Sequence, residues 1–185
     1  AIRATTGTAN GDTTTCSLIG PKIYYGDRFA GIEMRWKPIT AVTEVRIELG
    51  FVDVVPGSNK PIVNVLATPS VNTSVVDAAI YTFDDTSSTI TNQLTTIGTS
   101  ITAALKAITP PTAIAATTYN TIRIQLVTNH VYCWMDGQLV ARQNTAGTNY
   151  IEGGSAVAPF ALIRASDANS KSVDLDYIRV WQDRN

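Results

Sequence analysis

Acidic residues that lie close together in the sequence are the first candidates for chemistry. Asp174 and Asp176 share one face of an expected terminal strand, about 6.6 Å apart along the chain, so they could share a cation. Two carboxylates alone make a poor calcium site, and the alternative is a pair that is solvated or bound to a neighbouring arginine. Asp84 and Asp85 precede Thr-Ser-Ser, which is typical of a turn with Asx-type caps, with metal binding as the second interpretation. Because no calcium-loop signature is present, we expect no metal site and no cofactor.

Histidine and cysteine are scarce, which restricts nucleophilic and metal chemistry. The single histidine, His130, follows Asn129 at an expected hairpin tip and has no second histidine nearby, so we interpret it as an exposed turn residue. The two cysteines, Cys16 and Cys133, fall in expected strands. We interpret them as two buried free thiols, and a disulfide closing a long loop stays as the alternative.

Aromatic residues alternate with apolar ones at strand spacing, so any of them could face outward. They are Tyr24, Tyr25, Tyr132, Trp134, Tyr150, Tyr177 and Trp181. Exposed rings of this kind can stack on sugars, and we select Trp134 and Tyr150 as the candidates for stacking on a glycan. For the aromatic residues as a group, a place in the core or in an interface is the favoured interpretation.

The composition describes a charge-poor globular chain. Of the 185 residues 44% are hydrophobic and only 16% are charged, with a net charge of −1. The abundance of apolar residues excludes intrinsic disorder, and the lack of a basic run argues against a nucleic-acid partner. No stretch approaches 18 consecutive apolar residues, so we expect no membrane partner and a soluble chain.

Period-two alternation is the clearest structural signal in the first half. Residues 29–38 place Ile32, Met34 and Trp36 on one face and charged residues on the other. Residues 43–54 repeat the pattern, with apolar residues inward and charged residues, Glu48 among them, toward solvent. Because the link between the two segments is short, we expect them to form an antiparallel hairpin.

The second half contains a series of shorter strands. Residues 121–128 and 131–135 alternate in the same way, and Asp136-Gly137 favours a tight turn into residues 138–142, which predicts a three-stranded meander. Residues 160–165 and 172–181 complete the series.

The middle of the chain is less regular. Short strands are expected at residues 62–66 and 79–83, after a Pro- and Gly-containing loop. Residues 100–108 suit either a helix or a strand, and their flanks favour a hairpin around Gly98. Many short strands and few helical stretches predict an all-β fold in which residues 1–185 form one two-sheet antiparallel sandwich.

Three segments carry a resemblance to a known superfamily. They are Tyr119-Asn-Thr-Ile-Arg-Ile-Gln-Leu, Val131-Tyr-Cys-Trp-Met-Asp-Gly-Gln-Leu-Val and Leu175-Asp-Tyr-Ile-Arg-Val-Trp-Gln. Their order resembles the closing half of concanavalin A-like lectin/glucanase jelly rolls. The resemblance covers residues 119–182 well and the front half loosely, and it implies a jelly-roll sandwich rather than one function, since this fold hosts lectins, glycosidases and viral coat parts.

A narrower resemblance rests on five segments. They are Thr5-Thr-Gly-Thr-Ala-Asn-Gly-Asp-Thr, Gly31-Ile-Glu-Met-Arg-Trp, Arg46-Ile-Glu-Leu-Gly-Phe-Val-Asp, Ala79-Ile-Tyr-Thr-Phe-Asp-Asp and Asp174-Leu-Asp-Tyr-Ile-Arg-Val-Trp-Gln-Asp-Arg. The series is similar to jelly-roll structural proteins of tailed bacteriophages, which serve as head decoration, head fibre or tail parts. It implies a virion surface protein, assembled in the host cytoplasm, that binds phage coat protein or another virion protein and presents loops outward. We expect a phage capsid decoration protein that forms a homo-oligomer, with a trimer favoured. The alternative is a carbohydrate-binding, lectin-like module of a tail fibre or a secreted protein.

A glycoside hydrolase is the third interpretation. Retaining hydrolysis needs two carboxyl groups about 5 to 5.5 Å apart, and laminarinase-type enzymes of this superfamily place Glu-x-Asp-x-Glu, or a version one residue longer, on one strand. The nearest match is Glu48-Leu-Gly-Phe-Val-Asp53, which lacks the spacing and the third carboxylate. We therefore expect no catalytic residues and no enzymatic activity.

Overall fold

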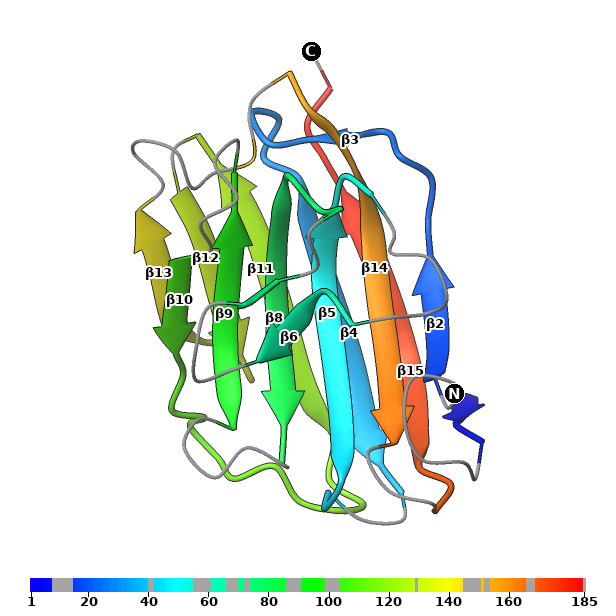
Figure 1. Cartoon of the computed structure of the whole chain (residues 1–185). Helices are drawn as coiled ribbons and strands as arrows, with labels where there is room; N and C mark the ends of the chain where they lie inside the picture. The colour runs from blue at the N-terminus through cyan, green and yellow to red at the C-terminus, as the bar shows by residue number, and fades with distance from the viewer. Residues whose placement is uncertain are drawn as a thin grey trace.

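Two antiparallel sheets face each other in the computed structural model (Figure 1). The structure describes residues 1–7, 15–39, 42–54, 61–65, 70–71, 74–85, 91–98, 104–128, 130–144, 151, 154–165 and 169–184. Sheet A contains the first and last strands of the chain, in the order β1 (Ile2–Thr5), β15 (Ser172–Trp181), β4 (Gly31–Pro38), β11 (Asn120–Val127), β12 (His130–Met135) and β13 (Gln138–Asn144).

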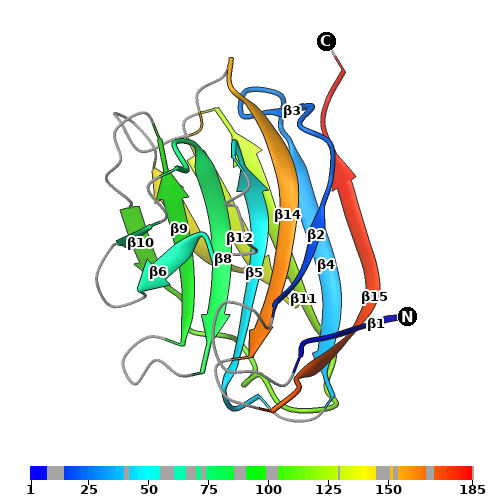
Figure 2. The same cartoon turned by 45° about the vertical axis from the view of Figure 1, so that its right-hand side comes forward.

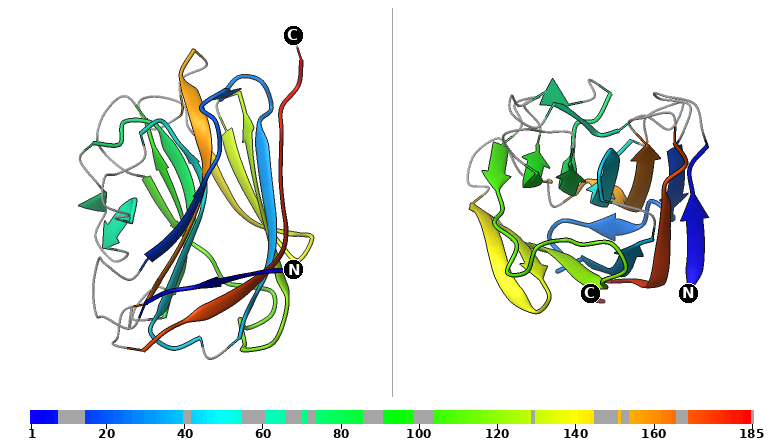
Figure 3. Two further views of the ribbon diagram at one scale, coloured as in Figure 1. Left: turned by 90° about the vertical axis from the view of Figure 1, so that its right-hand side faces the viewer. Right: turned by 90° about the horizontal axis from the view of Figure 1, so that it is seen from below.

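Sheet B forms the second layer, which the view from below separates from the first (Figure 3). Its order is β10 (Ala104–Ala107), β9 (Asn92–Ile97), β8 (Ala78–Asp84), β5 (Val45–Val52), β14 (Ala156–Ala165) and β2 (Thr15–Ile19), and β3 (Tyr24–Tyr25) pairs with β14. The described residues contain no helix, and hence none that could cross a membrane. The predicted all-β sandwich of two antiparallel sheets is confirmed.

The main core lies between the sheets, where the apolar face of each strand meets the other sheet. Ile32, Met34 and Trp36 of β4 are buried there against Ile47 and Leu49 of β5 and their neighbours. The predicted alternation holds for sheet A, because β11 and β12 alternate strictly between buried and half-buried positions. One face of sheet A is therefore core, and the other faces outward.

Sheet B is covered on both faces, although the charged face of residues 43–54 was expected to point toward solvent. A third small sheet, β6 (Val63–Val65) paired with β7 (Ser70–Val71), lies on the side of sheet B that faces away from sheet A (Figures 2 and 3). Beneath it Ile62, Val63 and Val75 form a second apolar cluster with residues of β5, β8 and β14. All eight residues of β5 are buried as a result.

The expected hairpin between residues 29–38 and 43–54 is wrong. β4 pairs with β15 and β11 in sheet A, whereas β5 pairs with β14 and β8 in sheet B. The short link after Pro38 crosses from one layer to the other. Two amphipathic strands can bury their apolar faces against each other across a sandwich as well as side by side in one sheet, and alternation alone does not distinguish the two.

Other predictions of strands are confirmed. The meander is present as β11, β12 and β13, and its second turn has positive φ at both Asp136 (49°) and Gly137 (81°), as a two-residue hairpin turn requires. The described part of residues 100–108 contains a strand, β10, which pairs with β9, so the hairpin interpretation holds and the helix does not. The residues between β9 and β10 lie partly outside the described part of the chain.

Candidate functional site

The outer face of sheet A carries the aromatic and charged side chains that alternate with the core residues. Strands β12 and β11 supply Tyr132, Trp134 and Arg123, and β15 supplies Trp181. All four side chains are half-buried, so each presents part of its surface to solvent. We call these four residues the aromatic ladder.

The ladder residues come from β11, β12 and β15, and the ladder passes over β4, which lies between β15 and β11. The rings of Tyr132 and Trp134 stack with centroids 5.6 Å apart and an interplanar angle of 26°. The Arg123 guanidinium lies 4.7 Å from the Trp134 ring centroid and 5.3 Å from that of Trp181. At the other end, Arg142 of β13 lies over Tyr132 at 5.7 Å. Rings and guanidinium groups therefore follow one another along one surface.

A glycine allows Trp181 to join this ladder. Gly31 of β4 is the cross-strand partner of Trp181, and a Cβ atom at Gly31 would come within 2.2 Å of the indole ring. Any other residue would push the ring away, because contacts under about 3 Å are not tolerated between such atoms. The absence of a side chain on β4 thus lets the indole lie across this strand toward Arg123 on β11.

Glu33 balances part of the positive charge near the ladder. Its Oε1 accepts hydrogen bonds from the Tyr177 hydroxyl (2.7 Å) and from Arg179 (2.8 Å). Burial alone would raise the pKa of the Glu33 carboxyl, but these two hydrogen bonds and the positive charges of Arg179 and Arg123 together hold that pKa below its ordinary value. Glu33 is therefore a charged acceptor that holds Tyr177 and Arg179 in place.

The two terminal-strand carboxylates each face an arginine. Asp174 accepts two hydrogen bonds from Arg3, at 2.7 and 3.1 Å, with Lys37 at 3.7 Å. Asp176 pairs with Arg35 at 2.6 Å. The hydrogen bond from Arg3 lowers the pKa of Asp174. The described residues form no group of three His, Cys, Asp or Glu that could hold a metal ion.

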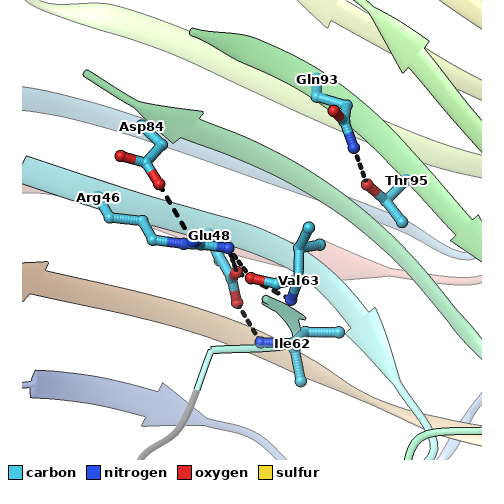
Figure 4. Close-up of polar contacts among 7 residues, drawn as sticks. All are labelled: Arg46, Glu48, Ile62, Val63, Asp84, Gln93 and Thr95. Atoms are coloured by element: carbon cyan, nitrogen blue, oxygen red, sulfur yellow. Dashed lines mark hydrogen bonds and ion pairs between the residues drawn. The ribbon is translucent and has the colours of Figure 1, made fainter. Parts of the chain in front are cut away.

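A second polar cluster is buried on the covered face of sheet B (Figure 4). Arg46 pairs with Glu48 at 2.9 Å and with Asp84 at 3.1 Å. The Glu48 carboxylate also accepts the backbone N–H groups of Ile62 (2.7 Å) and Val63 (3.1 Å), and Arg46 donates to the Val63 carbonyl oxygen. The cluster thus fastens the segment before β6 to sheet B.

This arrangement corrects the expectation that Glu48 faces solvent. The Glu48 side chain has no exposed surface, because residues 61–63 cover it. Burial raises the pKa of Glu48. Asp53, the second acidic residue of the segment compared with the hydrolase motif, accepts a hydrogen bond from the backbone N–H of Val76 (3.1 Å) after the end of β5.

Asp85 is half-buried. Desolvation, and then the charge of Asp84, raises the pKa of Asp85.

His130 and Cys16 differ from expectation, because His130 was expected to be an exposed turn residue and Cys16 to be buried. His130 begins β12, where it is half-buried, and its ring contacts Arg142 and the Thr128 carbonyl. Both cysteines are free, and Cys133 is buried whereas Cys16 is half-buried. Burial raises the pKa of the Cys133 thiol to about 12, so this thiol is not a nucleophile at neutral pH.

The two glycan-stacking candidates have different outcomes. Trp134 lies on the outer face of sheet A, within the aromatic ladder. Tyr150 lies outside the described residues. Tyr132 and Trp181, which also have strand spacing, join the ladder, and Arg123 was not foreseen. Its position opposite Trp134 follows from the register of β11 and β12, which the sequence does not display.

Comparisons with known proteins place the fold. No family model and no curated protein matches the sequence. Among solved structures, the carbohydrate recognition domain of Emp47p is similar over 98% of this chain and 89% of that chain, with a TM-score of 0.65 and 10% identity. The Crh5 transglycosylase in complex with NAG is similar over 99% of this chain and 73% of that chain, with a TM-score of 0.61 and 16% identity. The Bacillus licheniformis β-glucanase is similar over 84% of this chain and 67% of that chain, with a TM-score of 0.52 and 15% identity. The chain has the concanavalin A-like jelly-roll fold.

These structures also correct the prediction on catalysis. The expectation of no enzymatic activity, which rested on the missing carboxylate triplet, is contradicted, because a transglycosylase and a β-glucanase are among the similar structures. None of the three structures named above is a phage protein, so the likeness to phage structural proteins stays a prediction from the sequence.

Proposed function

We propose that this chain is a carbohydrate-binding, lectin-like module whose binding surface is the outer face of sheet A. One observation carries the proposal, namely the continuous ladder of Tyr132, Trp134, Arg123 and Trp181, partly exposed on a rigid sheet. The similarity to a carbohydrate recognition domain and to a transglycosylase in complex with NAG supports it, because related folds serve sugar chemistry.

The ladder offers both contacts that a sugar ring needs. The apolar C–H face of a pyranose packs against an aromatic ring, and the hydroxyl groups at its edge need donors and acceptors. Here the rings belong to Tyr132, Trp134 and Trp181, and hydrogen-bonding groups lie beside them on Arg123 and Gln125. Hydrogen-bonded strands hold these groups in place, so little conformational entropy is lost on binding.

We expect Trp134→Ala to weaken glycan binding about tenfold, because removing one stacked ring costs roughly 1.4 kcal/mol or more. The measurement is affinity electrophoresis through gels that contain soluble polysaccharides, followed by titration calorimetry with the oligosaccharide that retards the protein most. Tyr25→Ala is the matched control, since Tyr25 is a half-buried ring on β3, which pairs with sheet B. Equal loss in both variants, or no retardation of the natural protein in any gel, contradicts the proposal.

We further propose that the chain assembles into a homo-oligomer, as expected from its low charge content. The supporting observation is an apolar edge formed by β1 and β2, where Ile2, Leu18 and Ile19 are 73%, 46% and 50% exposed. These side chains border a pocket between the two sheets that is lined almost entirely by apolar residues. Light scattering at micromolar concentration is expected to give a multiple of 19.8 kDa, and a monomer mass would contradict this proposal. A trimer, a phage coat partner and a place on a virion remain predictions from the sequence.

A further inference from the structure

Sheet A carries an excess of positive charge in a chain whose net charge is −1. Its six strands contain six cations and three carboxylates. The cations are Arg3, Arg35, Lys37, Arg123, Arg142 and Arg179, and the carboxylates are Glu33, Asp174 and Asp176. A surface of one predominant sign attracts ligands of the opposite sign and speeds their binding. The outer face of sheet A is therefore suited to an anion.

The excess is concentrated at the aromatic ladder. Arg3, Arg35 and Arg179 pair with Asp174, Asp176 and Glu33, respectively. Arg123 and Arg142 form no ion pair with any described carboxylate. Glu33 is the cross-strand neighbour of Arg123 and feels its charge, but its hydrogen bonds come from Tyr177 and Arg179. Neither Arg123 nor Arg142 therefore donates to a carboxylate among the described residues, so both can bind an anionic group of a ligand.

Arg123 is held in a fixed orientation. Its guanidinium lies between the rings of Trp134 and Trp181, and one terminal nitrogen donates to the Gln125 side chain. Its Nε is enclosed and has no hydrogen-bond partner among the described residues. A guanidinium held between rings keeps the terminal N–H groups that Gln125 does not use in a fixed orientation for a carboxylate or sulfate, which a flexible lysine would not do. A surface depression lined by Arg123, Arg179, Val180 and Trp181 lies beside it.

We propose that the aromatic ladder binds an acidic polysaccharide, with Arg123 as the residue that contacts its carboxylate or sulfate groups. This inference rests on the proposed carbohydrate-binding function. Two sugar rings of the polysaccharide contact Trp134 and Trp181, and Arg123 receives the negative group of the sugar that lies between those two. Arg142, beside Tyr132, takes a second negative group farther along the chain.

The test compares four probes by titration calorimetry at low and at physiological salt. They are an oligogalacturonate, a heparin oligosaccharide, a neutral β-glucan oligosaccharide and a single-stranded oligothymidylate. We expect at least one of the two acidic sugars to bind about tenfold more tightly than the neutral one, with an affinity that falls as salt rises. Comparison of the oligogalacturonate with the heparin oligosaccharide shows whether the carboxylate or the sulfate group is recognised.

Two substitutions assign the effect to the ladder. Arg123→Met is expected to weaken neutral-sugar binding, because Arg123 belongs to the ladder, and to weaken acidic-sugar binding about tenfold more than that. Arg35→Met removes the same charge from the same face, but Arg35 is paired with Asp176, so acidic-sugar binding should change by less than about twofold. If Arg123→Met does not fold, Arg142→Met replaces it, because Arg142 is exposed beside the ladder and is proposed to bind the second negative group.

The outcomes separate this inference from the proposed function. Equal affinity for neutral and acidic sugars overturns the inference and leaves the carbohydrate-binding proposal standing. Tighter binding of oligothymidylate than of either acidic sugar overturns it in favour of a nucleic-acid surface. Binding of none of the four probes contradicts both.

Discussion

Deletion of residues 174–185 is expected to abolish cooperative folding and to give insoluble or molten protein. The deletion removes most of β15, which lies between β1 and β4 in sheet A and pairs with both (Figure 1). Loss of this strand leaves the edge of β4 unpaired and detaches β1 from the sheet. An exposed strand edge of this kind also promotes aggregation.

Side-chain burial accounts for much of the expected loss. Leu175 is buried in the core between the sheets, and Ile178 and Val180 pack against that core. Burying one such aliphatic side chain contributes about 1.5 to 3 kcal/mol when it is complete. Together with the broken ladder of hydrogen bonds, the loss approaches the whole stability of a typical domain, about 5 to 15 kcal/mol.

A shorter deletion at the other terminus is the control. Removal of residues 1–4 takes away most of β1, an edge strand of four residues of which only Ala4 is buried. This variant is expected to keep a cooperative thermal transition by circular dichroism. If the chain lacking residues 174–185 is soluble and melts like the full chain, the central position of β15 in sheet A is wrong.

The sequence predicts strands well where a strand has one core face and one wet face. β11, β12 and β13 fit that description, and Asp136-Gly137 specifies the turn between β12 and β13, so the order of strands in the meander could be predicted. The pairing of β4 with β15 could not, because it joins segments that are far apart in the chain, and alternation carries no information about the partner strand.

The position of Glu48 shows a different limit. Charged residues at alternate positions of β5 predicted a wet face, but residues 61–63 lie over it. A loop rich in Pro, Gly and Ser gives no signal that part of it, residues 61–63, will supply backbone N–H groups to a buried carboxylate. Burial of a charge by a distant backbone segment is a tertiary effect.

The candidate site could be predicted only in part, because it too depends on tertiary pairing of strands. Strand spacing is enough to place Trp134 on an outer face. The clamp around Arg123 requires Trp181 to lie over Gly31, an alignment between the last strand and β4 that depends on a register shift between Leu175 and Tyr177. Neither the alignment nor the shift can be read from local sequence.

Arg46→Met is expected to lower the free energy of unfolding by about 3 to 5 kcal/mol at neutral pH. Arg46 is the cation shared by Glu48 and Asp84, and all three side chains are buried beneath the segment before β6. Methionine fills much of the same space but leaves two buried carboxylates without their cation. Urea denaturation followed by fluorescence measures the difference. Arg3→Met is the matched control, because Arg3 also pairs with an aspartate but is largely exposed, and its loss should shift the midpoint only slightly.

The pH dependence of this loss identifies its cause. Without Arg46, the folded-state pKa of Glu48 rises further above that in the unfolded chain, where a glutamate titrates near 4.5. The folded variant then binds more protons than the unfolded chain in the window between those pKa values, so its stability falls as pH rises through that window and recovers as pH falls. The difference between the natural protein and Arg46→Met should therefore shrink from pH 7 toward pH 4, and Arg46→Met combined with Glu48→Gln should be more stable at pH 7 than Arg46→Met alone. A loss that stays constant over this range would mean that packing, and not the buried charge, accounts for the effect of Arg46.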